Sequence, residues 1–343
     1  MKIIVALSGG PDSVTLLHKL YTEKHTLLAV HFNHNLRETA KRDEIFVSDL
    51  CQKLNIPLKI ISLNVTDYVL KTKTSTEEGA RELRYKYLYE ILENTGYDKI
   101  ALGHNLNDKC ETILMNIVRG TGIDGLNGLK AETDHIFRPL INMTKSEIYE
   151  YLEKNNLSYC TDETNFENNY TRNKFRNIII PELLKINSGL FGNLSRLADI
   201  AKETEDFMAC ETEKAMTGFE NEITKEKINS LPIAIKHRVI KEIIVRAKGT
   251  TKDVSQKEVL RLCDLLEKSD NFKTFLDSGK IYAQMKNGVF SVEEKKEILR
   301  PVPFEYKITE PETYIKELGK TLIIHPIGYE KEINSPYLSG LTG

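Results

Sequence analysis

The chain has 343 residues, of which 40% are hydrophobic and 29% charged, as in ordinary globular proteins. Its 48 lysines and arginines nearly balance 50 acidic residues, so overall charge does not indicate nucleic acid binding, although a local basic surface is compatible with it. No apolar run approaches the ~20 residues of a membrane span. The five cysteines lie too far apart for a CxxC pair or a disulfide framework. We therefore expect a soluble cytoplasmic protein of two or three domains without a membrane partner.

The first 140 residues alternate short apolar runs with amphipathic helical patterns. This alternation predicts an α/β fold with a doubly wound, mostly parallel sheet. Ligands of such sheets bind at the carboxyl ends of the strands. The apolar runs are typical of strands buried on both faces, and they lie at residues 2–7, 26–32, 57–63, 99–104 and 135–141.

Beyond about residue 144 the alternation stops. Residues 145–156 and 174–185 favour helices, and a polar stretch separates them. The following segment favours a smaller, mainly helical domain with a hairpin at 280–294, where Asn-Gly marks the turn. We predict a catalytic domain over 1–186, a helical domain over 187–300, and a tail or incomplete C-terminal domain over 301–343.

The sequence SGGPDS joins the first strand to the first helix. Its glycines permit close backbone approach, its proline suits a first helical turn, and the helix amides then face an anion. Asp12 is unexpected beside phosphate unless Mg²⁺ lies between the carboxylate and the phosphate oxygens. A Gly-rich turn with no ligand is the simpler alternative. We assign ATP binding to Ser8, Gly9, Gly10, Pro11, Asp12 and Ser13.

This loop resembles the PP-loop of the N-type ATP pyrophosphatases, which cleave ATP between the α and β phosphates. Further segments narrow the resemblance to the tRNA(Ile)-lysidine synthetase family. One departure is Asn105, where that family usually has a second histidine. The segments are, in order, HFNHNLR at 31–37, EEGARELRYKYL at 77–88, the stretch from GHNLNDKCET to GLNGL at 103–129, FRPLI at 137–141, and DETNFENNYTRNKFRNIIIPEL at 162–183.

The resemblance implies ATP-dependent ligation of free L-lysine to C2 of the wobble cytidine in the CAU anticodon of isoleucine tRNA. ATP adenylates the cytidine, the lysine amine attacks C2, and lysidine, AMP and pyrophosphate result. Mg²⁺ accompanies ATP, with Asp12 as the metal-side residue. Because lysine's ammonium has a pKa of ~10.4, the site must bind the cation and then remove its proton.

Asp108 and Glu111 lie three positions apart at the start of a helix, so their carboxylates project from one face. We expect them to bind the lysine, or Asp108 to share the Mg²⁺. A solvated helix N-terminus that favours acids is the alternative. His104, at a strand end, is expected to hydrogen-bond a phosphate or the base. The residues assigned to catalysis are Asp12, Arg81, His104, Asp108 and Glu111.

Arginines provide the remaining candidates, because guanidinium groups bind phosphate in a bidentate manner. Arg81 and Arg84 are expected to neutralise phosphates or the adenylate, with salt bridges to neighbouring glutamates as the alternative. The resemblance implies that the segment around 172–176 handles the adenylated nucleotide and the tRNA, through Arg172, Asn173 and Arg176. The nucleotide base is expected near His31, Asn33 and His34.

The resemblance implies that the mainly helical domain over 187–300 contacts the tRNA. A basic helical stretch at 235–248 is a candidate RNA surface, with a solvated face above an apolar stripe as an equal alternative. Its cations are Lys236, Arg238, Lys241, Arg246 and Lys248.

Three other functions remain in view. A tRNA thiolase of the same superfamily typically needs paired cysteines, and a small-molecule amidating ligase leaves the TRNKFRN segment unexplained. A non-catalytic RNA-binding module is disfavoured by the acidic residues of the site. The sequence leaves open the oligomeric state and the discrimination between isoleucine and methionine tRNAs.

Overall fold

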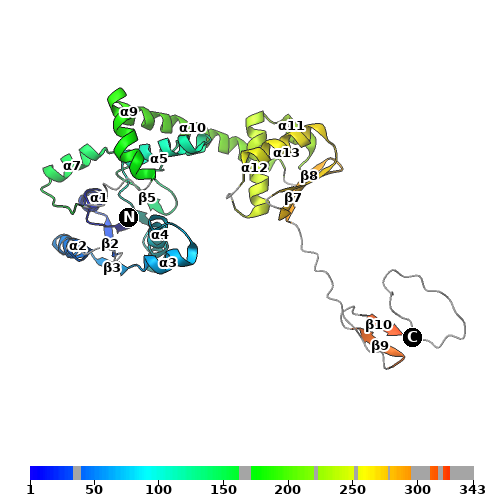
Figure 1. Cartoon of the computed structure of the whole chain (residues 1–343), viewed down its shortest axis with the longest axis horizontal. Helices are drawn as coiled ribbons and strands as arrows, with labels where there is room; N and C mark the ends of the chain where they lie inside the picture. The colour runs from blue at the N-terminus through cyan, green and yellow to red at the C-terminus, as the bar shows by residue number, and fades with distance from the viewer. Residues whose placement is uncertain are drawn as a thin grey trace, which may run out of the picture. The chain divides into compact units, whose positions relative to one another are not determined.

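The computed structural model describes residues 1–33, 40–161, 171–219, 223–250, 254–276, 279–294, 310–315 and 320–324 (Figure 1). The chain divides into two compact units, Met1–Asn221 with Leu231–Val239, and Glu222–Ser230 with Ile240–Gly343. Within the described ranges, no helix is long and apolar enough to cross a membrane. The predicted boundaries at residues 186 and 300 stay predictions.

The first unit is built on a five-stranded parallel sheet with the order β3-β2-β1-β4-β5. This confirms the predicted doubly wound α/β fold. The chain first extends the sheet on one side of β1 and then returns to extend it on the other, so β1 and β4 flank the switch point where ligands bind in such sheets. The strands are β1 (Lys2–Ala6), β2 (Thr26–Asn33), β3 (Leu58–Ser62), β4 (Lys99–Ala101) and β5 (Ile136–Phe137).

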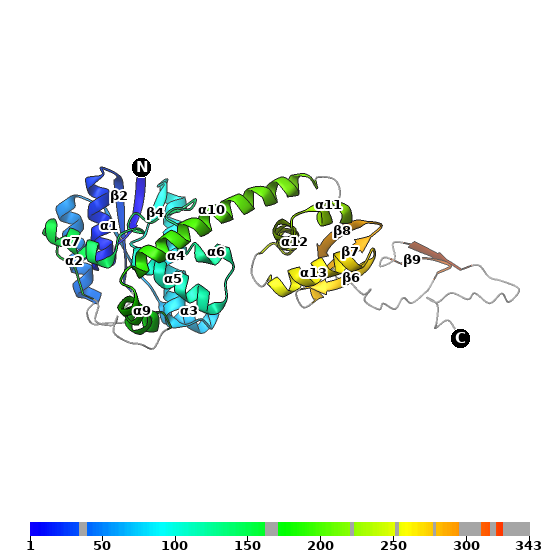
Figure 2. The ribbon, with the colours of Figure 1, turned by 90° about the horizontal axis from the view of Figure 1, so that it is seen from above.

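Helices cover both faces of this sheet (Figure 2). Ile3 and Val5 point to one face, where they pack with α1 (Pro11–Thr22), α2 (Ala40–Leu54) and α7 (Lys145–Lys154). The intervening Ile4 points to the other face, against α4 (Thr76–Thr95). Alternate side chains of β1 are thus buried in two separate cores, which explains why its sequence is continuously apolar.

Three further segments complete the site region. The apolar face of α5 (Leu106–Arg119) packs against the beginning of α10 (Leu190–Thr217), and α6 (Ile123–Leu126) lies beside both. A short helix, α3 (Val65–Thr72), which was not predicted, packs on α4. Its N-cap Asn64 accepts a hydrogen bond from the amide of Asp67.

The helix predicted at 174–185 is interrupted. It consists of α8 (Thr171–Lys174), a π-helical turn over Phe175–Ile179, and α9 (Ile180–Ile186). The amide of Ile180 bonds the carbonyl of Phe175, five residues back. Pro181 accounts for this widening, because a proline ring crowds the carbonyl four residues before it and donates no hydrogen bond. π turns are often found at functional sites.

The second unit contains helices and a three-stranded antiparallel sheet. The predicted hairpin is confirmed as β7 and β8, with Asn287 and Gly288 both at positive φ in the turn. Strand β6 was not predicted. The elements are α11 (Lys225–Ser230), α12 (Ile233–Lys248), whose first residues belong to the first unit, α13 (Gln256–Lys268), β6 (Phe272–Leu276), β7 (Ile281–Lys286), β8 (Val289–Glu294), and an antiparallel pair of β9 (Glu312–Ile315) and β10 (Lys320–Ile323).

Candidate active site

The loops that follow β1 and β4 meet at the switch point of the sheet. Gly103 makes this close approach feasible, because a Cβ atom there would lie 3.3 Å from the backbone carbonyl of Asp12. Any other residue at this position would push the loop after β4 away from the start of α1. The candidate catalytic groups of α1 and α5 are thereby brought together.

The phosphate loop, residues 8–13, is organised by the buried hydroxyl of Ser13. That oxygen accepts hydrogen bonds from the amides of Ser8 (3.2 Å) and Gly9 (3.1 Å), and it donates to the carbonyl of Gly10 (3.0 Å). Gly9 has a φ of +90°, which a residue with a side chain adopts only with strain. The Ser13 hydroxyl thus shapes the loop from within, and ATP binding by Ser13 stays a prediction.

Asn105 connects the phosphate loop to helix α5. Its Nδ2 donates to Asp12 Oδ1 (2.8 Å), and its side chain is 3% exposed. Asn105 also begins α5 with a capping box, in which Asp108 N donates to Asn105 Oδ1 (3.1 Å) and Asn105 N donates to Asp108 Oδ2 (3.0 Å). The sequence contained this signal, an asparagine three residues before an acid, but we assigned Asn105 no role.

The Asp12 carboxyl therefore occupies a defined position in a half-buried environment. Burial raises its pKa above the ordinary value, and the hydrogen bond from Asn105 acts in the opposite direction. The neighbouring Asp108 raises it further. A cation beside Asp12 would stabilise its buried negative charge and offset the repulsion between the Asp12 and Asp108 carboxylates. This fits the predicted metal-side role of Asp12.

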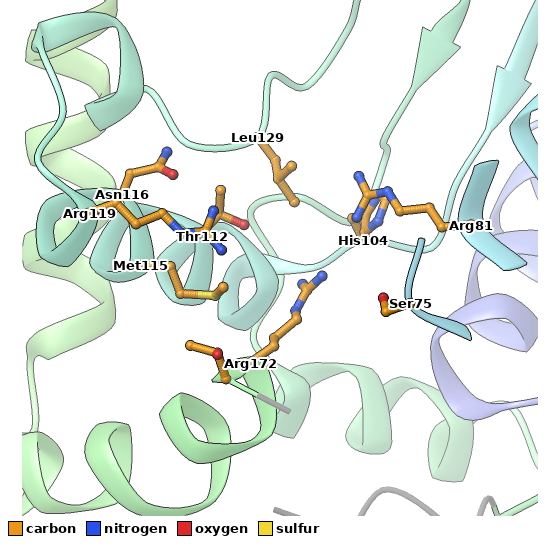
Figure 3. Close-up of a pocket in the computed structure, with 10 residues that line it drawn as sticks. Ser75, Arg81, His104, Thr112, Met115, Asn116, Arg119, Leu129 and Arg172 are labelled. Atoms are coloured by element: carbon orange, nitrogen blue, oxygen red, sulfur yellow. The ribbon is translucent and has the colours of Figure 1, made fainter. Parts of the chain in front are cut away.

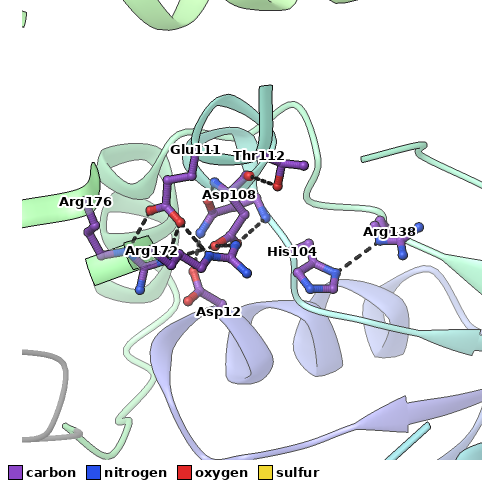
Figure 4. A network of polar contacts seen from close by, with 9 residues as sticks. Asp12, His104, Asp108, Glu111, Thr112, Arg138, Arg172 and Arg176 are labelled. Carbon is purple, nitrogen blue, oxygen red and sulfur yellow. Dashed lines mark hydrogen bonds and ion pairs between the residues drawn. The ribbon is translucent and has the colours of Figure 1, made fainter. Parts of the chain in front are cut away.

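Four charged side chains form one network, which we call the four-charge cluster: Asp108, Glu111, Arg172 and Arg176 (Figure 4). Glu111 is 1% exposed and receives Arg172 Nε at 2.8 Å and Arg176 Nε at 2.6 Å. Asp108 Oδ1 receives Nη2 of both arginines at 3.0 Å. The formal charges of the four side chains cancel.

His104 is held by a residue that sequence analysis did not single out. Arg138, which is 8% exposed, donates from Nε to His104 Nδ1 (3.1 Å) and from Nη1 to the carbonyl of Lys130 (2.8 Å). Burial, followed by the charge of Arg138, lowers the pKa of His104 to about 3. The imidazole is thus neutral near pH 7 and carries its proton on Nε2, because Nδ1 is the acceptor.

A cavity of about 400 Å³ lies beside the cluster (Figure 3). Arg81, His104 and Arg172 were predicted site residues and line it, whereas Arg84 and Asn173 do not. The lining comes from α4, α5, α8 and the adjoining loops: Ser75, Arg81, His104, Thr112, Met115, Asn116, Arg119, Leu129, Thr171 and Arg172.

The side chains predicted near the nucleotide base have partners within the fold. His31 is 4% exposed and its Nδ1 lies 2.9 Å from the carbonyl of Leu7. Asn33 donates to Glu44 Oε2 (3.0 Å) on α2. A nucleotide role for these two stays a prediction, and His34 lies outside the described residues.

Two arginines of the basic stretch on α12 form ion pairs, and one lysine is buried. Arg238 forms an ion pair with Glu205, and Arg246 pairs with Glu242 (3.0 Å). Lys236 is 5% exposed. The predicted apolar stripe is buried, at Val239, Ile240, Ile243 and Ile244. This geometry favours the helix-face alternative over a dedicated RNA surface.

Comparison with known proteins identifies the family of the chain. Residues 1–183 match a family model described as the PP-loop domain. The chain is 36% identical over 321 residues to the tRNA(Ile)-lysidine synthase of Clostridioides difficile, covering 90% of this chain and 70% of the relative. The Caldanaerobacter subterraneus enzyme of the same name is also 36% identical, with 93% and 71% covered.

The chain belongs to the tRNA(Ile)-lysidine synthase family. A more distant structural likeness joins it to the U34-tRNA thiolase NcsA from Methanococcus maripaludis, with a TM-score of 0.50 and 20% identity over 59% of this chain and 73% of that one. That likeness concerns the fold. The PP-loop domain over residues 1–183 accounts for ATP use. It contains the five-stranded sheet, at whose switch point the candidate site lies.

Proposed function

We propose that the protein ligates free L-lysine to C2 of the wobble cytidine in the CAU anticodon of an isoleucine tRNA. ATP adenylates the cytidine, and AMP, pyrophosphate and lysidine are the products. Family membership supports ATP-dependent lysidine formation on this tRNA. The observation that carries the residue assignment is the contact between Asn105 and both Asp12 and Asp108, which joins a phosphate loop to a carboxylate pair.

The phosphate loop supports binding of the departing pyrophosphate. The first turn of α1 presents amides next to the loop, and Asp12 stands at its edge with one carboxylate oxygen held by Asn105. No group of three or more acidic, His or Cys ligands forms a metal cage among the described residues. That fits Mg²⁺, which is commonly bound by one or two carboxylates together with substrate phosphates. Mg²⁺ would supply charge neutralisation as pyrophosphate leaves.

His104 acts in this scheme as a hydrogen-bond donor. With Arg138 on Nδ1 and a pKa of about 3, it has a proton on Nε2 and no positive charge. Such a group orients the cytidine or its adenylate without repelling the arginines around it. It is too weakly basic to accept a proton from lysine near neutral pH.

The four-charge cluster is the proposed lysine site. A lysine ammonium that replaces one guanidinium gains the same carboxylates, and the displaced arginine is then available to the anionic adenylate. Exchange of partners, rather than entry into an empty site, is the expected mode of binding.

The decisive test follows labelled lysine into RNA. The protein is incubated with ATP, Mg²⁺, labelled lysine and an isoleucine tRNA that carries CAU, and the matched control tRNA has uridine at the wobble position. We expect label only in the cytidine RNA, with one AMP released per lysine incorporated. The proposal fails if lysine stays out of the RNA while a sulfur donor or ammonia supports AMP release.

We also propose a cytoplasmic location, which suits the five cysteines because all of them are free thiols.

A further inference from the structure

Two arginines of the cavity have charges that no described carboxylate balances. Arg119, in the last turn of α5, forms no ion pair or side-chain hydrogen bond with the residues that the structure describes. Arg81 contacts the ring face of Tyr85, 5.6 Å away, and likewise has no ion pair within the described ranges. Arg172 also lines the cavity, but its charge is matched by Asp108 and Glu111.

These two cations lie at opposite ends of the cavity (Figure 3). His104 beside Arg81 is neutral and adds no charge. Met115 and Leu129 provide the apolar wall of the cavity, and Leu129 lies between the two cations (Figure 3). A volume of about 400 Å³ is enough for a small organic ligand. The cavity thus combines apolar wall with a cation at each end.

We propose that this cavity binds one unpaired RNA nucleotide, with its base against Met115 and Leu129 and a flanking phosphate on Arg119. The other flanking phosphate lies toward Arg81. Unpaired bases are commonly splayed into protein pockets, while arginines bind the backbone on either side. The inference rests on the proposed function, since the nucleotide is then the wobble cytidine. Arg119 becomes a substrate-binding residue that sequence analysis did not select.

Two other roles for Arg119 need to be separated from this one. A cation in the last turn of a helix is favourable by itself, because it complements the helix dipole. A guanidinium in this cavity would also bind the carboxylate of lysine. The first role predicts no change in RNA binding on mutation, and the second predicts a change in the KM for lysine.

The first experiment measures binding of an anticodon stem-loop RNA with CAU at several salt concentrations. The variants are Arg119→Ala, Arg119→Lys and the control Arg196→Ala, which removes an equal charge from an exposed position on α10 outside the cavity. For Arg119→Ala we expect about tenfold weaker binding and a plot of log K against log salt that is shallower by about 1. Arg119→Lys retains most affinity, and the control binds like wild type.

The second experiment locates the contact. A neutral methylphosphonate replaces, one at a time, the phosphate on each side of the wobble cytidine. One of the two replacements should weaken binding to the wild-type protein and leave Arg119→Ala unaffected, which is the signature of a direct contact in a double-mutant cycle.

The inference is overturned if Arg119→Ala binds the RNA like wild type, if Arg196→Ala weakens binding equally, or if both methylphosphonates weaken the variant as much as the wild type. It is also overturned if only the KM for lysine rises. Lysine incorporation by the wild-type protein tests the proposed function separately. If the double-mutant cycle shows the Arg119 contact but the wild-type protein incorporates no lysine, the phosphate contact is supported and the proposed ligation is wrong.

Discussion

Inside the phosphate loop, the hydrogen bonds of the Ser13 hydroxyl join residues at most five positions apart, whereas the four-charge cluster joins residues 61 to 68 positions apart. The bonds of Ser13 use neutral groups, and two further bonds, from Asn105 to Asp12 and from the amide of Cys160 to the carbonyl of Gly9, reach the loop from distant residues. The cluster uses ion pairs between α5 and the segment around the π turn. Neutral local bonds fix a shape before ligand arrives, while ion pairs between separate elements can exchange partners. We therefore call the phosphate loop the rigid half of the site, and the four-charge cluster, whose ion pairs exchange in the proposed lysine binding, the exchangeable half.

The largest expected effect tests the rigid half. Asp12→Ala should lower AMP formation on the order of 10⁴-fold, or about 5.5 kcal/mol, because the metal-side carboxylate is lost. RNA binding, measured by filter retention, should stay unchanged. Asp49→Ala, an exposed acid on α2, is the control and should retain activity. Normal turnover in Asp12→Ala would remove Asp12 from the metal role.

Next in size is the loss of the carboxylate that anchors the exchangeable half. Glu111→Gln leaves two guanidiniums facing a neutral buried group, and should lower the free energy of unfolding by about 3 kcal/mol. Urea denaturation measures this. Glu182→Gln disrupts only the exposed pair with Lys185 and should change stability by less than about 0.5 kcal/mol. Equal changes in the free energy of unfolding would show that the four-charge cluster stabilises the fold no more than an exposed ion pair does.

Acid should destabilise the protein through His104. Its pKa is about 3 in the fold and ordinarily 6.5, so between these values the unfolded chain binds a proton that the native protein does not. Stability from this source is complete above pH 6.5 and is lost as pH falls, by about 2 kcal/mol down to pH 5. Urea melts of wild type and His104→Gln at pH 7 and pH 5 compare the two. Parallel losses in both proteins would assign the effect to other groups.

The smallest expected effect concerns the shape of the phosphate loop. Ser13→Ala removes the acceptor for the Ser8 and Gly9 amides and should weaken binding of a non-hydrolysable ATP analogue about tenfold, or ~1.4 kcal/mol. Ser8→Ala should have less effect, because that exposed hydroxyl contacts only the Ser13 hydroxyl (3.1 Å) and the amide of Gly10 (3.4 Å). Calorimetry of both variants makes the comparison. Equal weakening by the two variants would contradict this expectation, because the Ser8 hydroxyl would then contribute as much to nucleotide binding as the Ser13 hydroxyl.

The same contrast explains what sequence could predict. The strand pattern, the SGGPDS loop and the carboxylates of α5 are local signals, and they indicated the fold and the acids of the site. The strands β4 and β5 are shorter than predicted, since Gly103 and Pro139 follow them closely and break the ladder.

The remaining features depend on contacts between distant residues. Nothing local shows that Arg172 and Arg176 bind Asp108 and Glu111, or that Arg138 reaches His104. Arg119 reads as an ordinary helix-ending cation until the cavity is seen. These are the positions at which periodicity and spacing carry no information about partners.

The bridge made by Asn105 has a thermodynamic consequence. The Asn105 carboxamide donates to Asp12 and accepts from the amide of Asp108, so it links the proposed nucleotide site to the helix that carries the proposed lysine site. Linkage then requires reciprocity. If saturating lysine increases the affinity for an ATP analogue by some factor, the analogue must increase the affinity for lysine by the same factor. Asn105→Ala should reduce that shared factor toward one, so that the two substrates bind as if each were alone.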